Sequence, residues 1–226
     1  MERPATIELA LWLNQFRQGN ITHTDACNAA ETITESLTVL KNGQELGWPA
    51  VTEKVAAAAT PIYAILPLPG NPYGLSVQTL SEIDPAKGVL VLSHNLVLAW
   101  TPELKTWNVL TIQMPPVFLE LKAARLHLQE LIDESTQVLS SLDLHGDRDP
   151  IDEELYELRA IYLPPALSQR IKTDLERAER IWLICQYGIN ESIAHGSPSS
   201  DALKVQTLNQ LKTAALELMA ACSSSS

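Results

Sequence analysis

The sequence predicts an α+β fold, in which a small, mainly antiparallel sheet of about four strands is embedded in about seven helices. Short apolar runs gather between residues 61 and 114, and longer stretches with apolar residues at helical spacing lie on both sides of them. We expect one domain over 1–222, with a helical N-terminal part (1–60), the sheet, and a helical C-terminal part (115–222). Residues 223–226 are expected to be a disordered tail.

Composition limits the classes of function. The chain has 226 residues, 46% hydrophobic and 19% charged, which is typical of a globular protein. The net charge is −11, and ten acidic residues but only one basic residue, Arg148, lie between Glu130 and Glu157. Because this charge repels phosphate backbones, we expect no nucleic-acid partner.

The sequence also predicts a cytoplasmic protein without a membrane segment. The longest apolar stretch, Gly88 to Trp100, is too short to span a bilayer, and the N-terminus has no signal-peptide pattern. Cys27, Cys185 and Cys222 are far apart and lie in predicted helices. They are interpreted as reduced core residues, and we expect no metal and no cofactor.

Three helices are expected in the first sixty residues. The first covers Ala5 to Gln18 and stops at Gly19. The second begins after Thr22, with Asp25 in its first turn, and extends to about Leu40; the third runs from Pro49 to near Ala59. A DNA-binding helix-turn-helix has the same outline, but the second helix has no Lys or Arg before Lys41, which favours a structural hairpin.

The segment 61–76 is the most constrained part of the chain. A short apolar run, Ile62 to Leu66, predicts a buried strand, which Pro67 prevents from continuing as an inner strand. Gly70 and Gly74 permit positive φ on either side of Asn71-Pro72-Tyr73. We therefore expect a rigid loop at a strand end, where binding residues often lie.

Three further strands are expected after a helical stretch at 77–83 and a turn at Asp84-Pro85: residues 89–93, 96–101 and 106–113. His94-Asn95 would form a two-residue hairpin loop. This register pairs Trp100 with Trp107 and makes both faces of the sheet apolar, so we expect helices to cover both. One face carries Val89, Val91, Leu98, Trp100, Trp107 and Val109, and the other carries Leu90, Leu92, Val97, Ala99 and Leu110.

The C-terminal part predicts helices over 117–142, 149–161, 166–193 and 200–222. Two patterns here invite a metal. The acidic run 143–154 has Asp and Glu at several calcium-loop positions, but Arg148 stands where that loop needs glycine. His127 shares a helix edge with Glu120, Glu130 and Glu134, but the order of residues does not match a di-iron site. A solvated loop and a wet helix edge explain both patterns.

The candidate binding residues are Gly70, Asn71, Tyr73, Gly74 and Ser76, with His94 as a possible polar partner. Two interpretations stay open for the loop. In one it is a rigid strand exit whose Tyr73 packs on the core, and in the other it builds a small pocket. No nucleophile, phosphate-binding or metal motif accompanies it, and we predict no catalytic residue.

The segment Leu66 to Leu75 resembles a family of uncharacterised actinobacterial proteins, in which a strand leads into Pro-x-Pro-Gly-Asp-Pro-x-Gly-Leu-Pro. Asn71 stands at the family's Asp, and Ser76 at its following Pro. The resemblance extends through Trp107 to the Ala220-Ala-Cys ending of the last helix. It implies that the domain is one unit, and it implies no known activity.

Three hypotheses about function follow. In the first, the protein acts through protein–protein interaction or self-association, with the helical faces and the acidic 130–157 surface available to a basic partner. In the second, it is a small-molecule binder or enzyme that uses the 70–76 loop and His94. In the third, the Thr22–Leu40 helix binds DNA, which its charge disfavours.

Overall fold

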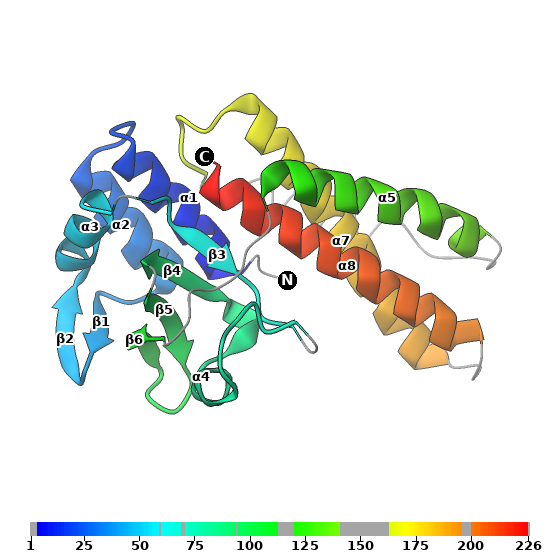
Figure 1. Cartoon of the computed structure of the whole chain (residues 1–226), viewed down its shortest axis with the longest axis horizontal. Helices are drawn as coiled ribbons and strands as arrows, with labels where there is room; N and C mark the ends of the chain where they lie inside the picture. The colour runs from blue at the N-terminus through cyan, green and yellow to red at the C-terminus, as the bar shows by residue number, and fades with distance from the viewer. Residues whose placement is uncertain are drawn as a thin grey trace. The chain divides into compact units, whose positions relative to one another are not determined.

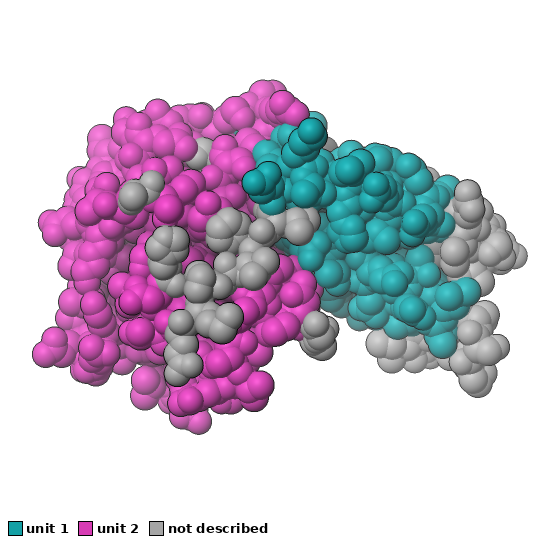
Figure 2. Space-filling view, viewed as in Figure 1, with its two compact units in different colours: residues 1, 119–161, 172–219 teal, residues 2–118, 162–171, 220–226 magenta. Residues whose placement is uncertain are grey.

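The computed structural model describes residues 4–58, 60–68, 71–93, 95–112, 120–140, 163–195 and 200–225 (Figure 1). The chain divides into two compact units (Figure 2). Unit 1 comprises residues 1, 119–161 and 172–219, and unit 2 comprises residues 2–118, 162–171 and 220–226. The predicted helix-dominated α+β class is confirmed. The expected single domain stays a prediction.

Unit 2 combines a sheet with short helices, whereas three long helices make up most of unit 1 (Figure 1). The helices of unit 2 are α1 (Ala5–Arg17), α2 (His23–Thr34), α3 (Trp48–Ala56) and α4 (Val77–Glu82), followed by a 3-10 turn, η1 (Pro85–Lys87). Its strands are β1 (Thr38–Lys41), β2 (Gln44–Gly47), β3 (Tyr63–Ile65), β4 (Val89–Ser93), β5 (Leu96–Thr101) and β6 (Thr106–Thr111). The long helices are α5 (Leu121–Ser140), α7 (Gln169–His195) and α8 (Ser200–Ser224).

The sheet has six strands in the order β2-β1-β6-β5-β4-β3, so the expectation of about four strands is wrong. β1 pairs with β6 in parallel, and the other four pairings are antiparallel. The sheet is therefore mixed, although antiparallel pairs predominate as predicted.

The two unexpected strands replace the end of the second predicted helix. Helix α2 stops at Thr34 instead of continuing to Leu40, because Glu35 adopts the left-handed conformation at φ 51°. The chain then forms a hairpin around Asn42 and Gly43, whose φ angles of 52° and 76° fit a type I′ turn. An Asn-Gly pair is a strong hairpin signal, and here it outweighs the helical pattern that predicts a helix to Leu40.

The predicted cap of the second helix is confirmed. Thr22 caps α2 by accepting a hydrogen bond from the Asp25 N–H, and the Asp25 carboxylate accepts one from the Thr22 N–H. Thr22 is confirmed as the cap, and the return bond from Asp25, which completes a capping box, goes beyond the predicted acidic residue in the first turn. The hydrogen bonds with Thr22 lower the pKa of Asp25. The bond with the Thr22 side chain has the larger effect, and the bond with the Thr22 backbone has the smaller.

The β5–β6 register is confirmed. Trp100 pairs with Trp107 and Thr101 with Thr106. The two indole rings meet edge to face, with centroids 6.0 Å apart and planes at 72°. This is a favourable geometry for an aromatic pair.

The predicted faces of β4 are wrong because of a β-bulge. The β4–β5 register shifts between Val91 and Ser93, so Val91 pairs with Val97 instead of Leu98. One extra residue in a strand moves every later side chain to the opposite face. The face that includes Val97 consequently holds a buried cluster, the apolar sheet cluster, made of Ile65, Leu75, Ile83, Val89, Val91, Val97, Ala99 and Ile112.

Helices cover both faces of the sheet, as predicted. Leu90 and Leu98, on the face opposite the apolar sheet cluster, are fully buried, and α1 packs against β3 and β4. On the cluster side, Leu80 of α4 packs against the cluster. Strand β3 is an edge strand, which agrees with its short length before Pro67.

A buried amide connects the first helix to the start of β3 and to the chain's end. The Asn14 amide nitrogen donates to the Ile62 carbonyl at 2.7 Å and to the Ser223 carbonyl at 2.8 Å, and its oxygen accepts from the Ile62 N–H at 2.9 Å. The sequence predicts a disordered tail from Ser223, whereas α8 continues to Ser224 and Ser223 is fully buried. Its hydroxyl also accepts from the Ala64 N–H at 3.4 Å, on the outer side of β3.

Unit 1 is held by apolar faces and side-chain pairs between its helices. Leu128 of α5, Leu175 of α7 and Leu211 of α8 are buried. Arg125 of α5 forms an ion pair with Asp174 of α7. The predicted 149–161 helix lies outside the described residues. Among the described residues, none of the helices is long and apolar enough to cross a membrane.

Candidate functional site

The loop after β3 is held in shape by backbone hydrogen bonds. Leu68 and Asn71 donate to each other's carbonyl oxygens, at 3.1 and 2.9 Å. A tight turn follows, in which the Leu75 N–H donates to the Pro72 carbonyl at 3.0 Å. We call residues 71–77 of this region the exit loop; Gly70 lies outside the described residues.

Tyr73 is a backbone outlier within the exit loop. Its φ is 51°, and the φ of Gly74 is 83°, which confirms the positive φ predicted for Gly74. A bulky residue with positive φ is uncommon and costs about 1–2 kcal/mol. The Asn71 side-chain oxygen accepts from the Tyr73 N–H at 3.4 Å, and the Tyr73 side chain packs against the apolar sheet cluster. These contacts hold the strained conformation in place.

Ser76 has a defined structural role. Its hydroxyl caps α4 by accepting from the Thr79 N–H at 3.1 Å. Asn71, Pro72, Gly74 and Ser76 are exposed. Asn71, Tyr73, Gly74 and Ser76 therefore lie in one short surface segment, their role in binding stays a prediction, and His94 lies outside the described residues.

A second cluster, absent from the predicted site residues, lies between α2 and α3. His23 is the first residue of α2, Cys27 follows one turn later, and Thr52 lies on α3. The Thr52 hydroxyl oxygen is 2.7 Å from His23 Nε2 and 3.5 Å from the Cys27 sulfur. The sulfur is 3.8 Å from His23 Nε2 and 4.0 Å from Nδ1. The sequence held one signal for it, the i, i+4 spacing of His23 and Cys27, which places both on one helix face.

Helix α3 also carries a lysine, Lys54, that lies close to a second lysine. The pKa of Lys54 is lowered, mainly by desolvation and further by the nearby charge of Lys41. Lys54 lies on α3 and Lys41 at the end of β1. Each ammonium therefore disfavours the charged form of the other.

Another buried thiol, Cys185, lies in unit 1. Cys185 is buried, and desolvation raises the pKa of its thiol to about 12. The ammonium of Lys212 acts weakly in the opposite direction, and burial lowers the pKa of Lys212 itself. Because the thiolate is the reactive form, Cys185 is expected to be chemically inert. All three cysteines are buried and free, as predicted.

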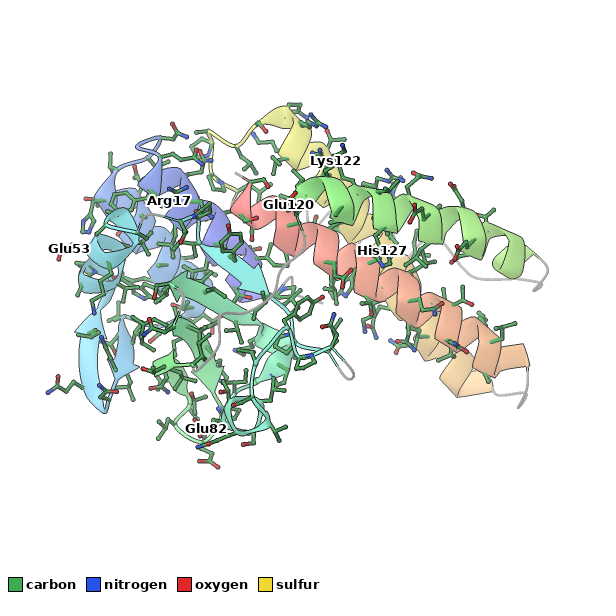
Figure 3. All side chains as sticks on the ribbon, viewed as in Figure 1. Arg17, Glu53, Glu82, Glu120, Lys122 and His127 are labelled. Carbon is green, nitrogen blue, oxygen red and sulfur yellow. The ribbon has the colours of Figure 1, made fainter. Side chains whose placement is uncertain are left out.

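Among the described residues, no three His, Cys, Asp or Glu side chains are arranged to hold a metal ion. The acidic run 143–154 lies outside them. His127, on α5 (Figure 3), instead approaches a carboxylate of α8. Its Nε2 lies 3.8 Å from Oε2 of Glu217. Glu120, Glu130 and Glu134 are exposed, which fits a solvated helix edge.

Comparison with known proteins returned no match to any family model, curated protein or solved structure. The resemblance of the Leu66–Leu75 segment to an actinobacterial family stays a prediction.

Proposed function

We propose that the protein acts by binding another protein, and that the exit loop is a central part of the contact surface. The observation that carries this proposal is a rigid, exposed and uncharged loop on a strongly acidic protein. No Asp, Glu, Lys or Arg occurs between Val55 and Ser81, although the whole chain has a net charge of −11. Interface cores are depleted in charged residues relative to the rest of a protein surface.

The loop also presents apolar side chains to solvent. Val77, directly after the Ser76 cap, is 85% exposed, and Pro72 is exposed beside the half-buried Tyr73. Exposed aliphatic residues are common singly, so exposure alone would not suffice. Here they lie on a segment that backbone hydrogen bonds and the α4 cap already hold, and a preorganised loop loses little entropy when it binds.

The strained backbone of Tyr73 supports the same conclusion. Strained conformations are kept where the surrounding structure over-determines them, and they cluster at binding sites. The small-molecule alternative needs Asn71 and Tyr73 to line a pocket together. Asn71 is exposed and the Tyr73 ring packs against the sheet, an arrangement that favours a protein surface as the partner.

Site-specific photo-cross-linking in the cell of origin tests the proposal. In one variant, p-benzoylphenylalanine replaces Val77. In a second variant of the same chain it replaces Leu104, which is 60% exposed in the β5–β6 turn. We expect a discrete protein adduct from position 77 and none from position 104. An adduct of two copies of this chain would identify self-association.

The affinity for the cross-linked partner, and its dependence on salt, distinguish the exit loop from the acidic 130–157 surface as the binding site. Val77→Asp is expected to weaken binding of the cross-linked partner at least tenfold, as an interface hot spot does. Binding through an uncharged loop should change little between low and high salt, whereas binding through the acidic 130–157 surface should weaken strongly. Equal adducts from both positions, or unaltered affinity of a folded Val77→Asp protein, would contradict the proposal.

A further inference from the structure

We propose that the open edge of β2 binds an extended segment of another protein as an added antiparallel strand, with a basic side chain opposite Glu45 and an apolar side chain opposite Leu46. Strand β2 is the outermost strand of the sheet and lies at the margin of unit 2 (Figure 1). The exit loop follows β3, the strand at the other edge, so this inference does not rest on the proposed function.

The register of the β1–β2 hairpin determines which backbone groups face outward. Lys41 pairs with Gln44 across the two-residue turn, so these two residues exchange the hydrogen bonds that close the hairpin. Because hydrogen-bonded pairs alternate along an antiparallel ladder, the Glu45 N–H and carbonyl and the Gly47 N–H point away from β1. These groups, which we call the outer groups of β2, can form a ladder with an added strand.

The two edges of the sheet differ in whether their backbone groups are covered. At the β3 edge, the Ser223 hydroxyl accepts from the Ala64 N–H at 3.4 Å. At the β2 edge, Gln44, Glu45 and Gly47 are exposed, and no hydrogen bond from a described residue reaches the outer groups. Within β2 there is neither a proline nor a bulge, two features that often protect an edge. The β2 edge is therefore open to pairing with another chain.

Side chains along β2 define the chemistry of the added strand. Glu45 is exposed at the centre of the edge and forms no ion pair with another described residue. Directly opposed side chains of opposite charge stabilise an antiparallel pair, and the net charge of −11 also favours a basic partner. Leu46 is half-buried on the other face of the strand. It offers an apolar contact to the residue that precedes the basic one in the added strand.

Two lysines restrict where the basic residue can lie. Lys41 shares a face with its pair Gln44 and lies close to Lys54 of α3. A basic side chain opposite Gln44 would approach these two ammonium groups, whereas one opposite Glu45 lies on the other face of the sheet. A second copy of the chain fits this edge poorly, because antiparallel pairing centred on Glu45 would bring two carboxylates together.

A fluorescein-labelled peptide, Thr-Val-Lys-Thr-Thr, tests the edge in the intact chain by fluorescence anisotropy. We expect saturable binding, and about fivefold weaker binding when the Lys of the peptide is replaced by Glu. Glu45→Lys should reverse this preference, so that the Glu peptide binds more tightly than the Lys peptide. The reversal separates a directly opposed pair from the general attraction between a basic peptide and an acidic protein.

A pair of variants at one position tests the backbone hydrogen bonds. Glu45→Pro removes an outer N–H and leaves the β1–β2 ladder intact, because that N–H points away from β1. Glu45→Ala is the matched control, since it also removes the carboxylate but keeps the N–H. We expect the Lys peptide to bind Glu45→Pro at least tenfold more weakly than Glu45→Ala. Equal affinities of the two folded variants would overturn the proposal.

If Glu45→Pro does not fold, N-methylated peptides decide. Methylation of the backbone nitrogen of the peptide's Lys, which faces the Glu45 carbonyl, should weaken binding at least tenfold. Methylation of the next nitrogen, which faces away from β2, should weaken it less than about threefold. Equal losses from both peptides, or no saturable binding of the Lys peptide, would overturn the proposal. A wild-type dimer in sedimentation that Glu45→Ala strengthens and the peptide dissociates would overturn it too, by assigning the edge to a second copy.

Discussion

The two units use polar contacts in different ways. In unit 2, the buried Asn14 side chain bonds to backbone groups of Ile62 and Ser223, and Gly88 lies where a side chain would not fit. In unit 1, polar contacts such as Arg125 with Asp174 join side chains near the surface of packed helices. Unit 2 is therefore expected to depend on a few irreplaceable positions, and unit 1 on apolar burial distributed along its helices.

The difference between the two units arises because strands and helices satisfy their backbone hydrogen bonds in different ways. Helices satisfy their own backbone groups, so a helical unit needs only matching apolar faces. An edge strand and its connections leave backbone groups that another element must satisfy, and Asn14 does this for Ile62. Substitutions in each unit test this difference between the two units.

Gly88→Ala should have the largest effect. Gly88 has φ +77°, and a Cβ there would lie 2.2 Å from Thr6 Oγ1 and 2.7 Å from Leu66 Cδ2. Left-handed strain and overpacking together predict a loss of about 4 kcal/mol in the free energy of unfolding, measured by urea denaturation. Gly43→Ala is the matched control, because Gly43 has φ +76° with open space around it, and should lose about 1 kcal/mol. Equal losses would show that packing at Gly88 is unimportant.

Asn14→Leu should come next, with a loss of about 3 kcal/mol. The leucine is similar in size but leaves the Ile62 N–H and carbonyl and the Ser223 carbonyl without their side-chain partner. Asn20→Ala is the control, since Asn20 is exposed and its side-chain amide donates to the Gln15 and Gln18 side chains, and it should change stability by less than about 0.5 kcal/mol. A loss below 1 kcal/mol for Asn14→Leu would remove the proposed contrast between the units.

The Cys185 thiol predicts how the stability of unit 1 depends on pH. Burial raises its pKa from 9.0 to about 12, so the folded chain keeps the proton that the unfolded chain releases. This contribution is complete below pH 9 and is lost as the pH rises from about 9 to about 12. Between pH 8 and 10.5 it amounts to about 2 kcal/mol.

Urea denaturation of the wild-type protein and Cys185→Ala at both pH values isolates this effect from other titrating groups. The wild type should lose about 2 kcal/mol more than the variant between the two conditions. Equal losses in both proteins would show that Cys185 is not protected from ionisation.

Arg125→Met should have the smallest effect. The Arg125–Asp174 pair is partly exposed, with 23% and 17% of the two side-chain surfaces accessible. Such pairs contribute about 1 kcal/mol or less, and methionine keeps most of the apolar packing. A loss as large as that of Asn14→Leu, in the same denaturation measurement, would show that unit 1 also relies on individual polar contacts.

The candidate sites illustrate what could be predicted. The exit loop was found from the closely spaced prolines and glycines after Leu66, because each restricts or permits backbone angles locally. The positive φ of Tyr73 was not predicted, since it depends on Asn71 and on packing against the sheet. The His23 cluster was also missed, because Thr52 lies 29 residues away in the sequence.

Features that depend on neighbouring residues could be predicted from the sequence alone. These are the Thr22 cap, the β5–β6 hairpin with Trp100 opposite Trp107, and the buried thiols on helices. Each follows from hydrogen bonds or apolar spacing within a few residues. The Asn42-Gly43 turn belongs to this class as well, and was missed only because a helical pattern was extended past it.

The meeting of distant elements, in contrast, is set by tertiary packing. This packing placed β1 parallel to β6, introduced the bulge after Val91, and brought Asn14 to Ser223 across 209 residues of sequence. No local preference selects these partners. They follow from the need to bury both faces of the sheet and to satisfy every buried backbone group at once, which only the folded chain can do.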